Sequence, residues 1–380
     1  MVGVIGLLAS SACGRFGFDP SASGDATSSA SGWLAPEWSD RKRIVISASS
    51  IAEDLSAFPV SIVIIGDASI RAHIGPTGDD LRFTLGDGET LVPFDVEEFD
   101  QATGTLSAWV TPPALSASTN TTLYVYYGNA VASSAEDPAA TFSNAYHAVW
   151  HMAEIPTVTP NAYDTTTYSH VGTFNGGMPA TASVPGVVGR ALDFDGVDDY
   201  VSTPDSPSLR FADQPFSIDA WVFMRNASAF KIYAKGLTRP GIEYYFRTGQ
   251  EADDDLIIRS YDAGGDYIGR LYSAGMTPYT NVWTHVAATY DGSRTNAGFA
   301  LYVDGNRVDD QDAALNVYDG ALSAGAAVDI GRYQGGGFAN GTIDELRLSS
   351  VVRSPGWFLT TVRNIDQRSA FYTVSPEESR

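Results

Sequence analysis

The chain has 380 residues, enough for two ordinary domains and a tail, and its 44% hydrophobic residues can supply each domain with a core. Its net charge of −22 would repel a phosphate backbone, so the composition argues against a nucleic-acid partner. The single cysteine, Cys13, excludes an internal disulfide.

The first residues have the order of an export signal. Residues 2–12, VGVIGLLASSA, form an apolar run that ends in small residues directly before Cys13. This order is typical of a bacterial lipoprotein signal, which is cleaved before a cysteine that then carries lipid. Two features depart from that pattern, because no Lys or Arg precedes the run and Ser10 stands where leucine is usual.

We therefore expect residues 1–12 to be a signal and the protein to be exported, held to the bacterial envelope or cell surface by a lipid on Cys13. The alternative interpretation is a disordered N-terminus with a chance cysteine, and secretion without an anchor. No other apolar run approaches the roughly 18 residues that span a bilayer, so a membrane is expected as a partner only through the lipid. Residues 13–32, rich in Ser, Ala and Gly, are predicted to be a flexible tether.

Residues 33–130 are predicted to form a β-sandwich. The segments RIVISA, FPVSIVII, DLRFTL, TLVPFDVEEF, TLSAWVTP and TTLYVYYG are short and rich in β-branched and aromatic residues. They recur every 10–15 residues or so, separated by turn residues, which is the spacing of an all-β sandwich. Residues 131–145 lose this pattern and are predicted to be a linker or a short helical turn.

Strand signals resume at residue 146 and continue, with turn residues between them, toward the end of the chain. So many strands exceed one flat sheet, and two stacked antiparallel sheets would bury both inner faces. Asp304-Gly305, between LYV and NRV, predicts a two-residue hairpin. Near the end, Ser354 and Pro355 in SPGWFLTTVRN are suited to the N-cap and first position of one short helix.

Several motifs of this second segment occur in a familiar order: VWHMAE, GRALDFDGVDDYV, FSIDAWV, WTHVAATYDG, LYVDGNRV and GTIDELRLSSVVRS. The ordered set resembles the concanavalin A-like laminin G-type module of bacterial surface and secreted proteins, over about residues 146–375. The resemblance implies a jelly-roll sandwich. The loop after Asp164, DTTTYSHVGT, departs from the Gly/Asn-rich loop that is usual in the family.

The first segment, about residues 33–130, is similar to a bacterial envelope-associated β domain family of unknown function, on motifs such as DLRFTLGDGETLVPFDVEEFD. That family often precedes laminin G-like modules, and it implies a sandwich without indicating a ligand. The expected fold is therefore all-β, with two tandem β-sandwiches, the second a concanavalin A-like jelly roll, and a short C-terminal helix.

Asp344 in TIDELRL is the first candidate for a functional carboxylate. On a regular strand it shares side-chain phase with Leu346 and Leu348, so it would point toward the core if those leucines do. An inward carboxylate needs a partner, because burying it alone is costly. A hard cation held by oxygen atoms is one solution. Hydrogen bonds from Arg347, Arg332 or backbone amides are the other.

The resemblance favours the cation, because modules of this family often hold a structural Ca²⁺ between the first strands and the last. The matching positions here are Asp164, Asp195 and Asp344, with Asp198 and Glu345 as secondary candidates.

Tyrosines in the middle of the second segment are candidates for a sugar platform, because aromatic rings stack on the C–H faces of sugars. The residues concerned are Tyr244, Tyr245 and Tyr267. The alternative is ordinary strand packing, which also uses tyrosine.

Catalytic motifs are missing from the sequence. There is no GxSxG or HExxH motif, and the adjacent Asp344 and Glu345 would point to opposite faces of a regular strand, which does not suit a glycosidase pair. We expect a non-catalytic, exported binding or adhesion protein with structural calcium, whose partner is a polysaccharide or glycoconjugate. The alternatives are a structural envelope protein that binds another envelope protein and, less favoured, a glycoside hydrolase or its accessory subunit.

Overall fold

A computed structural model of the chain describes residues 32–236, 238, 241–249, 253–333 and 337–380. Cys13 and the expected signal lie outside the described residues. The fold is nearly all β with a few short helices, which confirms the predicted fold class. Residues 33–380 make up one compact unit. None of the helices in the described residues combines the length and the apolar character needed to cross a membrane.

The first sandwich is built from two sheets, with the strand orders β29-β1-β9-β4-β5 and β3-β7-β6. Strand β1 alternates buried and more exposed residues, and its Ile44 and Ile46 face the core. The strands are β1 (Asp40–Ile46), β3 (Val60–Ile64), β4 (Arg82–Leu85), β5 (Leu91–Val92), β6 (Phe94–Asp100), β7 (Thr105–Val110), β9 (Thr121–Tyr127) and β29 (Tyr372–Ser379).

Small elements complete this sandwich. Strands β2 (Leu55–Ser56) and β8 (Ala114–Leu115) pair with each other, and a short helix η1 (Ala48–Ser50) follows β1. Helix α1 (Ala68–His73) was not predicted from the sequence. Its N-cap Asp67 accepts hydrogen bonds from the backbone of Ser69 and Ile70.

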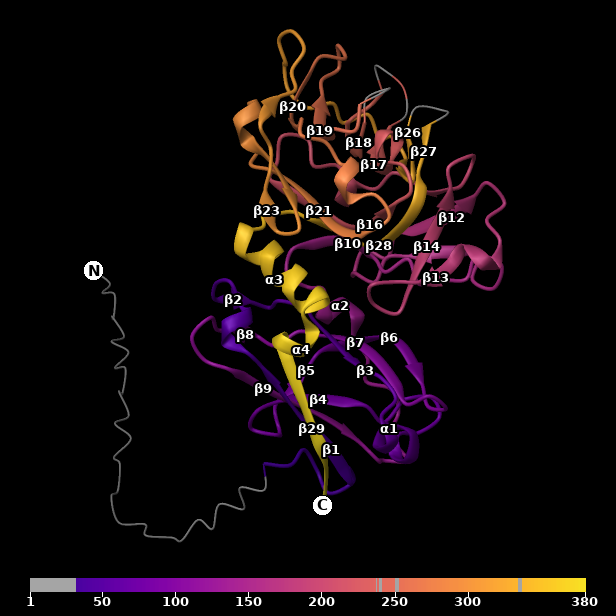
Figure 1. Cartoon of the computed structure of the whole chain (residues 1–380), viewed down its shortest axis with the longest axis vertical. Helices are drawn as coiled ribbons and strands as arrows, with labels where there is room; N and C mark the ends of the chain where they lie inside the picture. The colour runs from indigo at the N-terminus through magenta and orange to yellow at the C-terminus, as the bar shows by residue number, and fades with distance from the viewer. Residues whose placement is uncertain (1–31, 237, 239–240, 250–252, 334–336) are drawn as a thin grey trace, which may run out of the picture. The chain divides into compact units, whose positions relative to one another are not determined.

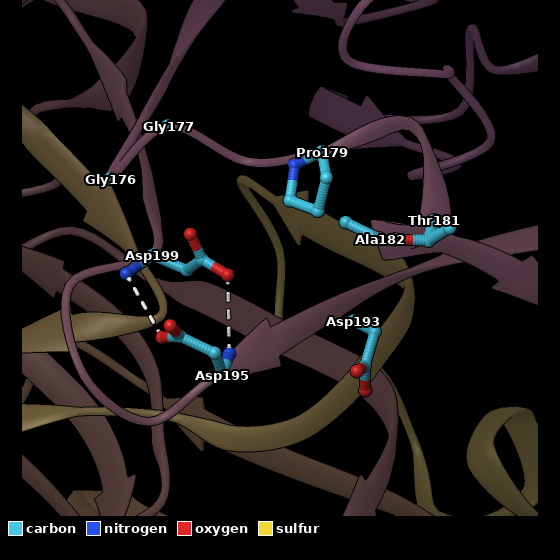
Figure 2. A pocket seen from close by; sticks show the side chains of 8 residues that line it. All are labelled: Gly176, Gly177, Pro179, Thr181, Ala182, Asp193, Asp195 and Asp199. Carbon is cyan, nitrogen blue, oxygen red and sulfur yellow. Dashed lines mark hydrogen bonds between the residues drawn. The ribbon is translucent and has the colours of Figure 1, made fainter.

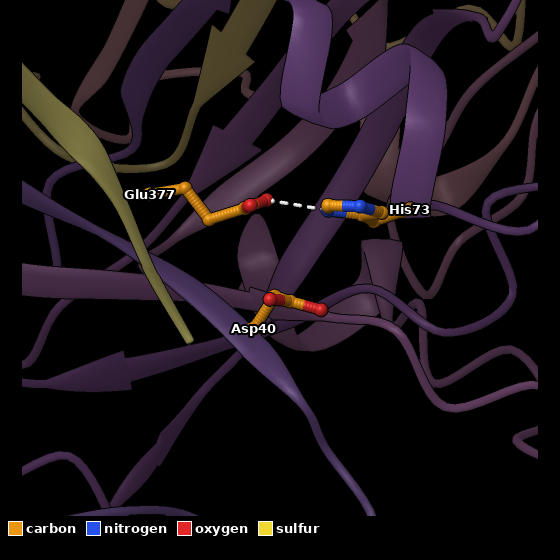
Figure 3. Close-up of side chains that lie close together, drawn as sticks. All are labelled: Asp40, His73 and Glu377. Carbon is orange, nitrogen blue, oxygen red and sulfur yellow. Dashed lines mark hydrogen bonds and ion pairs between the residues drawn. The ribbon is translucent and has the colours of Figure 1, made fainter. Parts of the chain in front are cut away.

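The last strand of the chain belongs to the first sandwich. Strand β29 pairs antiparallel with β1, and Figure 1 shows it in yellow beside the indigo β1. Glu377 strengthens this pairing, because its Oε2 lies 2.9 Å from Nδ1 of His73 (Figure 3). The same oxygen accepts a bond of 2.8 Å from the hydroxyl of Tyr127. The second module therefore ends before residue 375, the limit expected from the sequence.

Two helices carry the chain back to that strand. Helix α3 (Pro355–Asp366) begins after Ser354, whose hydroxyl accepts a bond of 3.0 Å from the backbone of Trp357, as the sequence predicts. Helix α4 (Arg368–Phe371) follows directly. Asn364 of α3 ties this helix to β3, because its side-chain amide accepts from the N–H of Ser61 at 2.7 Å and donates to its carbonyl at 3.0 Å.

The second sandwich also consists of two large sheets. In one sheet the order is β13-β14-β28-β16-β21-β22-β23, with β10 also paired to β28. We call it the inner sheet, because it lies next to the first sandwich. Its outer side, which faces away from the core of the second sandwich, packs against the first sandwich. Its strands are β10 (Tyr146–Trp150), β13 (Ser183–Pro185), β14 (Arg190–Asp195), β16 (Phe216–Met224), β21 (Trp283–Tyr290), β22 (Phe299–Val303), β23 (Asn306–Arg307) and β28 (Asn340–Ser349).

The other sheet, which we call the distal sheet, has the order β11-β12-β15-β25-β17-β18-β19-β20-β24. Its strands are β11 (Asn161–Tyr163), β12 (Val171–Asn175), β15 (Tyr200–Thr203), β17 (Lys231–Lys235), β18 (Tyr244–Thr248), β19 (Leu256–Tyr261), β20 (Tyr267–Tyr272), β24 (Gln311–Asp312) and β25 (Val328–Ile330). Beside it, β26 (Arg332–Tyr333) pairs with β27 (Gly337–Phe338). Short helical turns connect the strands: η2 (Ala180–Ala182), η3 (Pro207–Leu209), η4 (Ala227–Ala229), η5 (Thr277–Tyr279) and η6 (Asn296–Gly298).

One apolar core fills the space between the inner and distal sheets, with Ile218 and Ile343 on one side and Phe246 and Ile258 on the other. The predicted hairpin at Asp304-Gly305 is confirmed, since β22 and β23 pair directly across it. Both turn residues have positive φ, 47° and 75°, as a two-residue hairpin of this kind requires.

A second core runs from the first sandwich to the outer side of the inner sheet. It contains Ile44 and Trp109 of the first sandwich together with Trp221 and Tyr302 of the inner sheet. The segment expected to be a linker takes part in it, because Phe142, which follows helix α2 (Pro138–Thr141), is fully buried. The two sandwiches therefore share a continuous apolar contact rather than a loose connection.

Candidate ligand-binding and cation sites

Asp344 lies in an irregular part of its strand, which changes where its side chain points. The pairing of β16 with β28 shifts register between Asp219 and Trp221, and Glu345 has a φ of 50°. Such a bulge adds one residue and reverses the alternation beyond it. Leu346 faces the core of the second sandwich, whereas Asp344 points to the outer side of the inner sheet.

Two expectations are corrected by this bulge. Asp344 does not share side-chain phase with Leu346 and Leu348. Asp344 and Glu345 do not point to opposite faces either, because Asp344 contacts Val187 and Glu345 contacts His151, both on the outer side of the inner sheet. Burial and the charge of Glu345 raise the pKa of Asp344 well above its usual range. The carboxylate of Asp344 accepts a bond of 2.7 Å from the backbone of Val187, so it is buried at the boundary between the sandwiches.

Asp164 has a full set of partners of its own. Its Oδ1 accepts from the backbone of Val149 and Thr166, each at 2.9 Å. Its Oδ2 lies 2.6 Å from Nδ1 of His170 and accepts from the hydroxyl of Thr166 at 2.9 Å. These bonds leave little for an ion to coordinate, and none of these partners is shared with Asp195 or Asp344.

Asp195 stands at the end of β14, where the chain turns through Gly196. Strand β14 does pair with β28, so the late segment lies beside the early turn as the sequence suggests. The direct neighbour of Asp195 is Asn340, however, four residues before Asp344. The structure therefore does not bring Asp164, Asp195 and Asp344 together into the expected site.

A different set of carboxylates gathers at this turn. Asp195, Asp198 and Asp199 each offer an oxygen, and these oxygens lie within 4.8 Å of one another. Figure 2 shows the two hydrogen bonds that connect Asp195 and Asp199, each from the backbone of one residue to the carboxylate of the other. An open cavity of about 240 Å³ lies beside them, bordered by Gly176 and Asp193.

The pKa values of two carboxylates in this turn, Asp195 and Asp199, are shifted in opposite directions. Burial and the charge of Asp195 raise the pKa of Asp199 to about 6. Although partial burial opposes it, the backbone N–H groups of Val197, Asp198 and Asp199 lower the pKa of Asp195. Ionisation of Asp199 therefore costs free energy, and a bound cation would lower that cost.

The donor set of the turn suits a hard cation. All donors are carboxylate oxygens, with backbone carbonyls close by, which is the chemistry that Ca²⁺ prefers. Asp193 is less suited to the role, because Arg225 already binds it through Nη1 at 2.7 Å. Asp195 and Asp198, two of the residues expected from the sequence, fit this arrangement. Asp199 was not expected, although the pattern DGVDDY contains it.

The three candidate tyrosines occupy different places. Tyr244 is buried in the core of the second sandwich, where its hydroxyl donates to the carbonyl of Leu209 at 2.8 Å. It cannot stack on a sugar, so this expectation was wrong. Tyr245 points to the other side of the distal sheet, because neighbours along a strand alternate. It is also buried, whereas Tyr267, which lies beside Tyr261, is half-buried.

Three cations lie on that same outer side of the distal sheet. Lys231 stands directly opposite Arg247, and Arg259 directly opposite Tyr245, on the adjacent strands β17, β18 and β19. Their exposed fractions are only 6%, 6% and 7%. We call these three residues with Tyr245, Tyr261, Tyr267 and Tyr333 the cation–tyrosine face.

The cations of this face have aromatic partners, and none of the described residues forms an ion pair with them. The guanidinium of Arg247 lies 4.8 Å from the ring of Tyr245, and that of Arg259 lies 4.3 Å from Tyr267. In the described part of the chain, Lys231, Arg247 and Arg259 form no ion pair, and Nε of each arginine has no hydrogen-bond partner. Burial and the charge of Arg247 lower the pKa of Lys231 to about 7.

Sequence reasoning missed these cations because each lies singly in its own strand. The alternation in KIYAK, YYFRT and LIIRSY places an occasional charged residue on one side of each strand. This signal is present in the sequence, but only the order of strands in the distal sheet brings the three residues together.

A further acidic group lies in the first sandwich, where Asp40 joins His73 and Glu377 (Figure 3). The carboxylate of Glu377 raises the pKa of the exposed His73. This group connects β29 to the sandwich, so its place in the structure is explained by pairing alone.

Comparison with known proteins shows that two segments of the chain are similar to known families. Residues 195–357 match the family model described as the concanavalin A-like lectin/glucanases superfamily. Residues 77–147 match that of a domain of unknown function, DUF2341. No curated protein sequence matches the chain.

Solved structures give weaker similarities. Domain 4 of AbnA, a GH43 extracellular arabinanase from Geobacillus stearothermophilus in complex with arabinotriose, is 19% identical, with a TM-score of 0.41, over 56% of this chain and 96% of that one. The receptor binding domain of a botulinum neurotoxin C/D mosaic serotype is 12% identical, with a TM-score of 0.42, over 58% and 51%. The binding domain of Paraclostridial Mosquitocidal Protein 1 is 13% identical, with a TM-score of 0.43, over 57% and 52%.

The two family matches confirm the resemblances that the ordered sequence motifs indicated. Residues 195–357 are similar to the concanavalin A-like lectins and glucanases, and the segment before them is similar to a domain family of unknown function.

Proposed function

We propose that this protein is an exported, non-catalytic binding protein whose second sandwich binds an acidic polysaccharide or glycoconjugate on the cation–tyrosine face. The observation that carries the proposal is the set of three buried cations, Lys231, Arg247 and Arg259, without an acidic partner in the described residues. In a chain with a net charge of −22, acids to neutralise them are abundant. The lack of an ion pair to these cations among the described residues is therefore a specific feature.

The energetic argument rests on charge burial. A buried cation without an acidic partner costs several kcal/mol, on the order of 3–5 when a partner is removed from a pair. Lys231 and Arg247 also repel each other across the strands. Contacts with aromatic rings return only about 0.5–2 kcal/mol for each cation. A carboxylate or sulfate group of a ligand would supply the missing charge, and an arginine can bind it with two hydrogen bonds.

Tyrosine rings beside the cations suit the sugar part of such a ligand. Tyr267 is half-buried, whereas Tyr333 keeps only 7% of its surface exposed, so Tyr267 offers the more accessible ring. Rings of this kind pack against the C–H faces of sugars, while charged groups read the acidic substituents. At physiological ionic strength the screening length is about 8 Å, so distant acids of the protein weaken this local attraction little.

Binding to polygalacturonate, with neutral dextran as the comparison, tests the proposal. In 0.15 M salt the full chain should bind polygalacturonate and not dextran. The variant R247Q/R259Q should lose at least tenfold in affinity without a lower melting temperature, because two unpaired buried charges are removed. Arg225→Gln is the matched control, since Arg225 pairs with Asp193 elsewhere on the module and should leave binding unchanged.

Protonation of Lys231 gives a second readout. Because its pKa is about 7, Lys231 carries its charge below pH 7 and loses it above. Affinity for polygalacturonate should therefore fall between pH 6 and pH 8.5 in the wild type, and less in K231M. Equal affinity of R247Q/R259Q and wild type, or binding to a purified envelope protein instead of any acidic glycan, would contradict the proposal.

We also propose that Asp195, Asp198 and Asp199 hold a structural Ca²⁺. Support comes from the convergence of three carboxylates beside an open cavity and from the raised pKa of Asp199. When bound, the ion would neutralise the turn and fix the loop of Gly176 against it. Chelation should lower the melting temperature of the wild type and leave that of D199N nearly unchanged.

Export and lipid anchoring through Cys13 remain part of the proposal. Their support is the apolar run that ends in small residues before Cys13. Membrane fractionation and mass analysis of the N-terminal peptide would test them. The C13A variant should appear in the soluble fraction, whereas the wild type should carry an acylated N-terminal cysteine.

A further inference from the structure

Two β-bulges, one in each sandwich, direct glutamates toward the same histidine. Strand β6 shifts register between Val96 and Glu98, which leaves Glu97 as the extra residue. In β28 the extra residue is Glu345, with its φ of 50°. Bulges re-aim side chains and are common beside functional sites. His151, which directly follows β10, lies between the two glutamates.

The distances describe a small three-residue group. His151 Nδ1 lies 2.7 Å from Oε1 of Glu345 and 3.9 Å from Oε2 of Glu97. One ligand atom from each of the three residues falls within 4.8 Å of the others. The group borders a cavity of about 290 Å³ that Glu154 and Tyr163 also line. An ion could reach it by that route.

Two of the three side chains, His151 and Glu345, are already held through an atom that the group does not need. His151 Nε2 lies 3.1 Å from Asp95, which in turn accepts from the hydroxyl of Thr165 at 2.9 Å. Arg347 donates to Oε2 of Glu345 at 2.7 Å. Metal sites use this arrangement, in which a ligating imidazole gives its other N–H to a carboxylate.

One buried oxygen of the group has no partner. The Glu97 side chain is 1% exposed, and although its Oε2 accepts from Trp109 at 3.0 Å, its Oε1 has no hydrogen bond in the described residues. Oδ1 of the nearby Asp344 is likewise buried without a partner. A buried carboxylate oxygen left unpaired is costly, and a ligand that supplies positive charge would lower that cost.

The charges of the boundary agree with that conclusion. Asp95, Glu97, Asp344 and Glu345 meet only two cationic side chains in the described residues, Arg347 and His151. Burial and the charge of Glu345 raise the pKa of Glu97 well above its usual range, so a positive charge bound beside it would favour its ionised form.

We propose that Glu97, His151 and Glu345 bind one divalent transition-metal ion, with Zn²⁺ as the probe, and that this ion joins the two sandwiches. An imidazole nitrogen with two carboxylates favours zinc-like ions over Ca²⁺, which takes oxygen ligands only. Binding would displace the proton between His151 and Glu345. The ion would connect β6 of the first sandwich to β10 and β28 of the second.

Titration of the chelator-treated full chain with ZnCl₂ tests the proposal. Calorimetry and metal analysis should give one tightly bound Zn²⁺ per chain, and Co²⁺ in its place should show visible absorption bands. Glu97→Gln should weaken binding at least tenfold. Glu154→Gln, at the rim of the same cavity, and Asp195→Asn, at the turn, are matched controls that should keep wild-type affinity.

Folding of the variant is checked separately. In chelator, E97Q should melt no lower than the wild type, because a neutral amide replaces an unpaired buried acid of the same shape. Asp95 is a positioning residue, so D95N should weaken Zn²⁺ binding about tenfold without abolishing it. The proposal is overturned if the wild type takes up no Zn²⁺ at micromolar concentration, or if E97Q binds Zn²⁺ as tightly as E154Q does.

Discussion

The turn at Asp195 allows a prediction in which two neighbouring acids have opposite effects on stability. Asp199 has a pKa of about 6 in the folded chain, against an ordinary value of 3.8. Since the folded state resists ionisation, its stability falls as pH rises from about 4 to 6 and stays lower above that. Replacing Asp199 by Asn removes this penalty, because the amide oxygen can still accept from the backbone of Asp195.

The size of the effect follows from the shift. About two pKa units correspond to about 3 kcal/mol at pH 7.5 and about half of that at pH 5, as an upper limit. The cavity beside Asp199 is open to solvent, so we expect a gain of about 1–3 kcal/mol at pH 7.5 for D199N in chelator. D195N should lose about 1 kcal/mol, since the ionised Asp195 caps three backbone N–H groups.

Urea unfolding of the full chain, followed by tryptophan fluorescence at pH 5 and 7.5, measures both variants. In chelator, D199N should be the more stable protein at pH 7.5, and its advantage should shrink at pH 5. Added Ca²⁺ should stabilise the wild type and reverse the order. If D199N is no more stable than the wild type at pH 7.5, the electrostatic reasoning about this turn is wrong, whatever calcium does.

Two further predictions concern the first sandwich. Gly104 has a φ of 72°, and a Cβ there would collide with the carbonyl of Asp67, whereas Gly66 has a φ of 70° with open space around it. In thermal unfolding, G66A should cost about 1 kcal/mol and G104A about 2–4, and equal costs would show that the close approach is not tight. Asn364→Ala should cost about 2–4 kcal/mol, because it leaves both backbone groups of the buried Ser61 unpaired; Asn306→Ala, on an exposed hairpin, should stay within about 0.5. Chemical denaturation would check this pair, and a small loss for N364A would indicate that water replaces the amide.

Local signals in the sequence determined much of this fold. Alternating residues, Asp-Gly turns and the Ser354-Pro355 pair act over a few residues, so they predicted the strands, the hairpin at Asp304 and the start of α3. The order of motifs identified the second module, and the pairing of β14 with β28 followed from it.

Other features depended on contacts that no local pattern records. The C-terminal strand β29 pairs with β1, more than 300 residues earlier, and so becomes the edge strand of a sheet of the first sandwich. The cation–tyrosine face exists only because β17, β18 and β19 are neighbours in one sheet.

The predicted metal site shows the difference most clearly. From the sequence alone, Asp344 and Glu345 were expected on opposite faces of a regular strand. The tertiary structure decided otherwise, because the pairing of β28 with β16 places an extra residue at Glu345 and turns both acids toward the first sandwich. A bulge is fixed by the partner strand, so the residues of one strand determine its alternation but not the point at which it breaks.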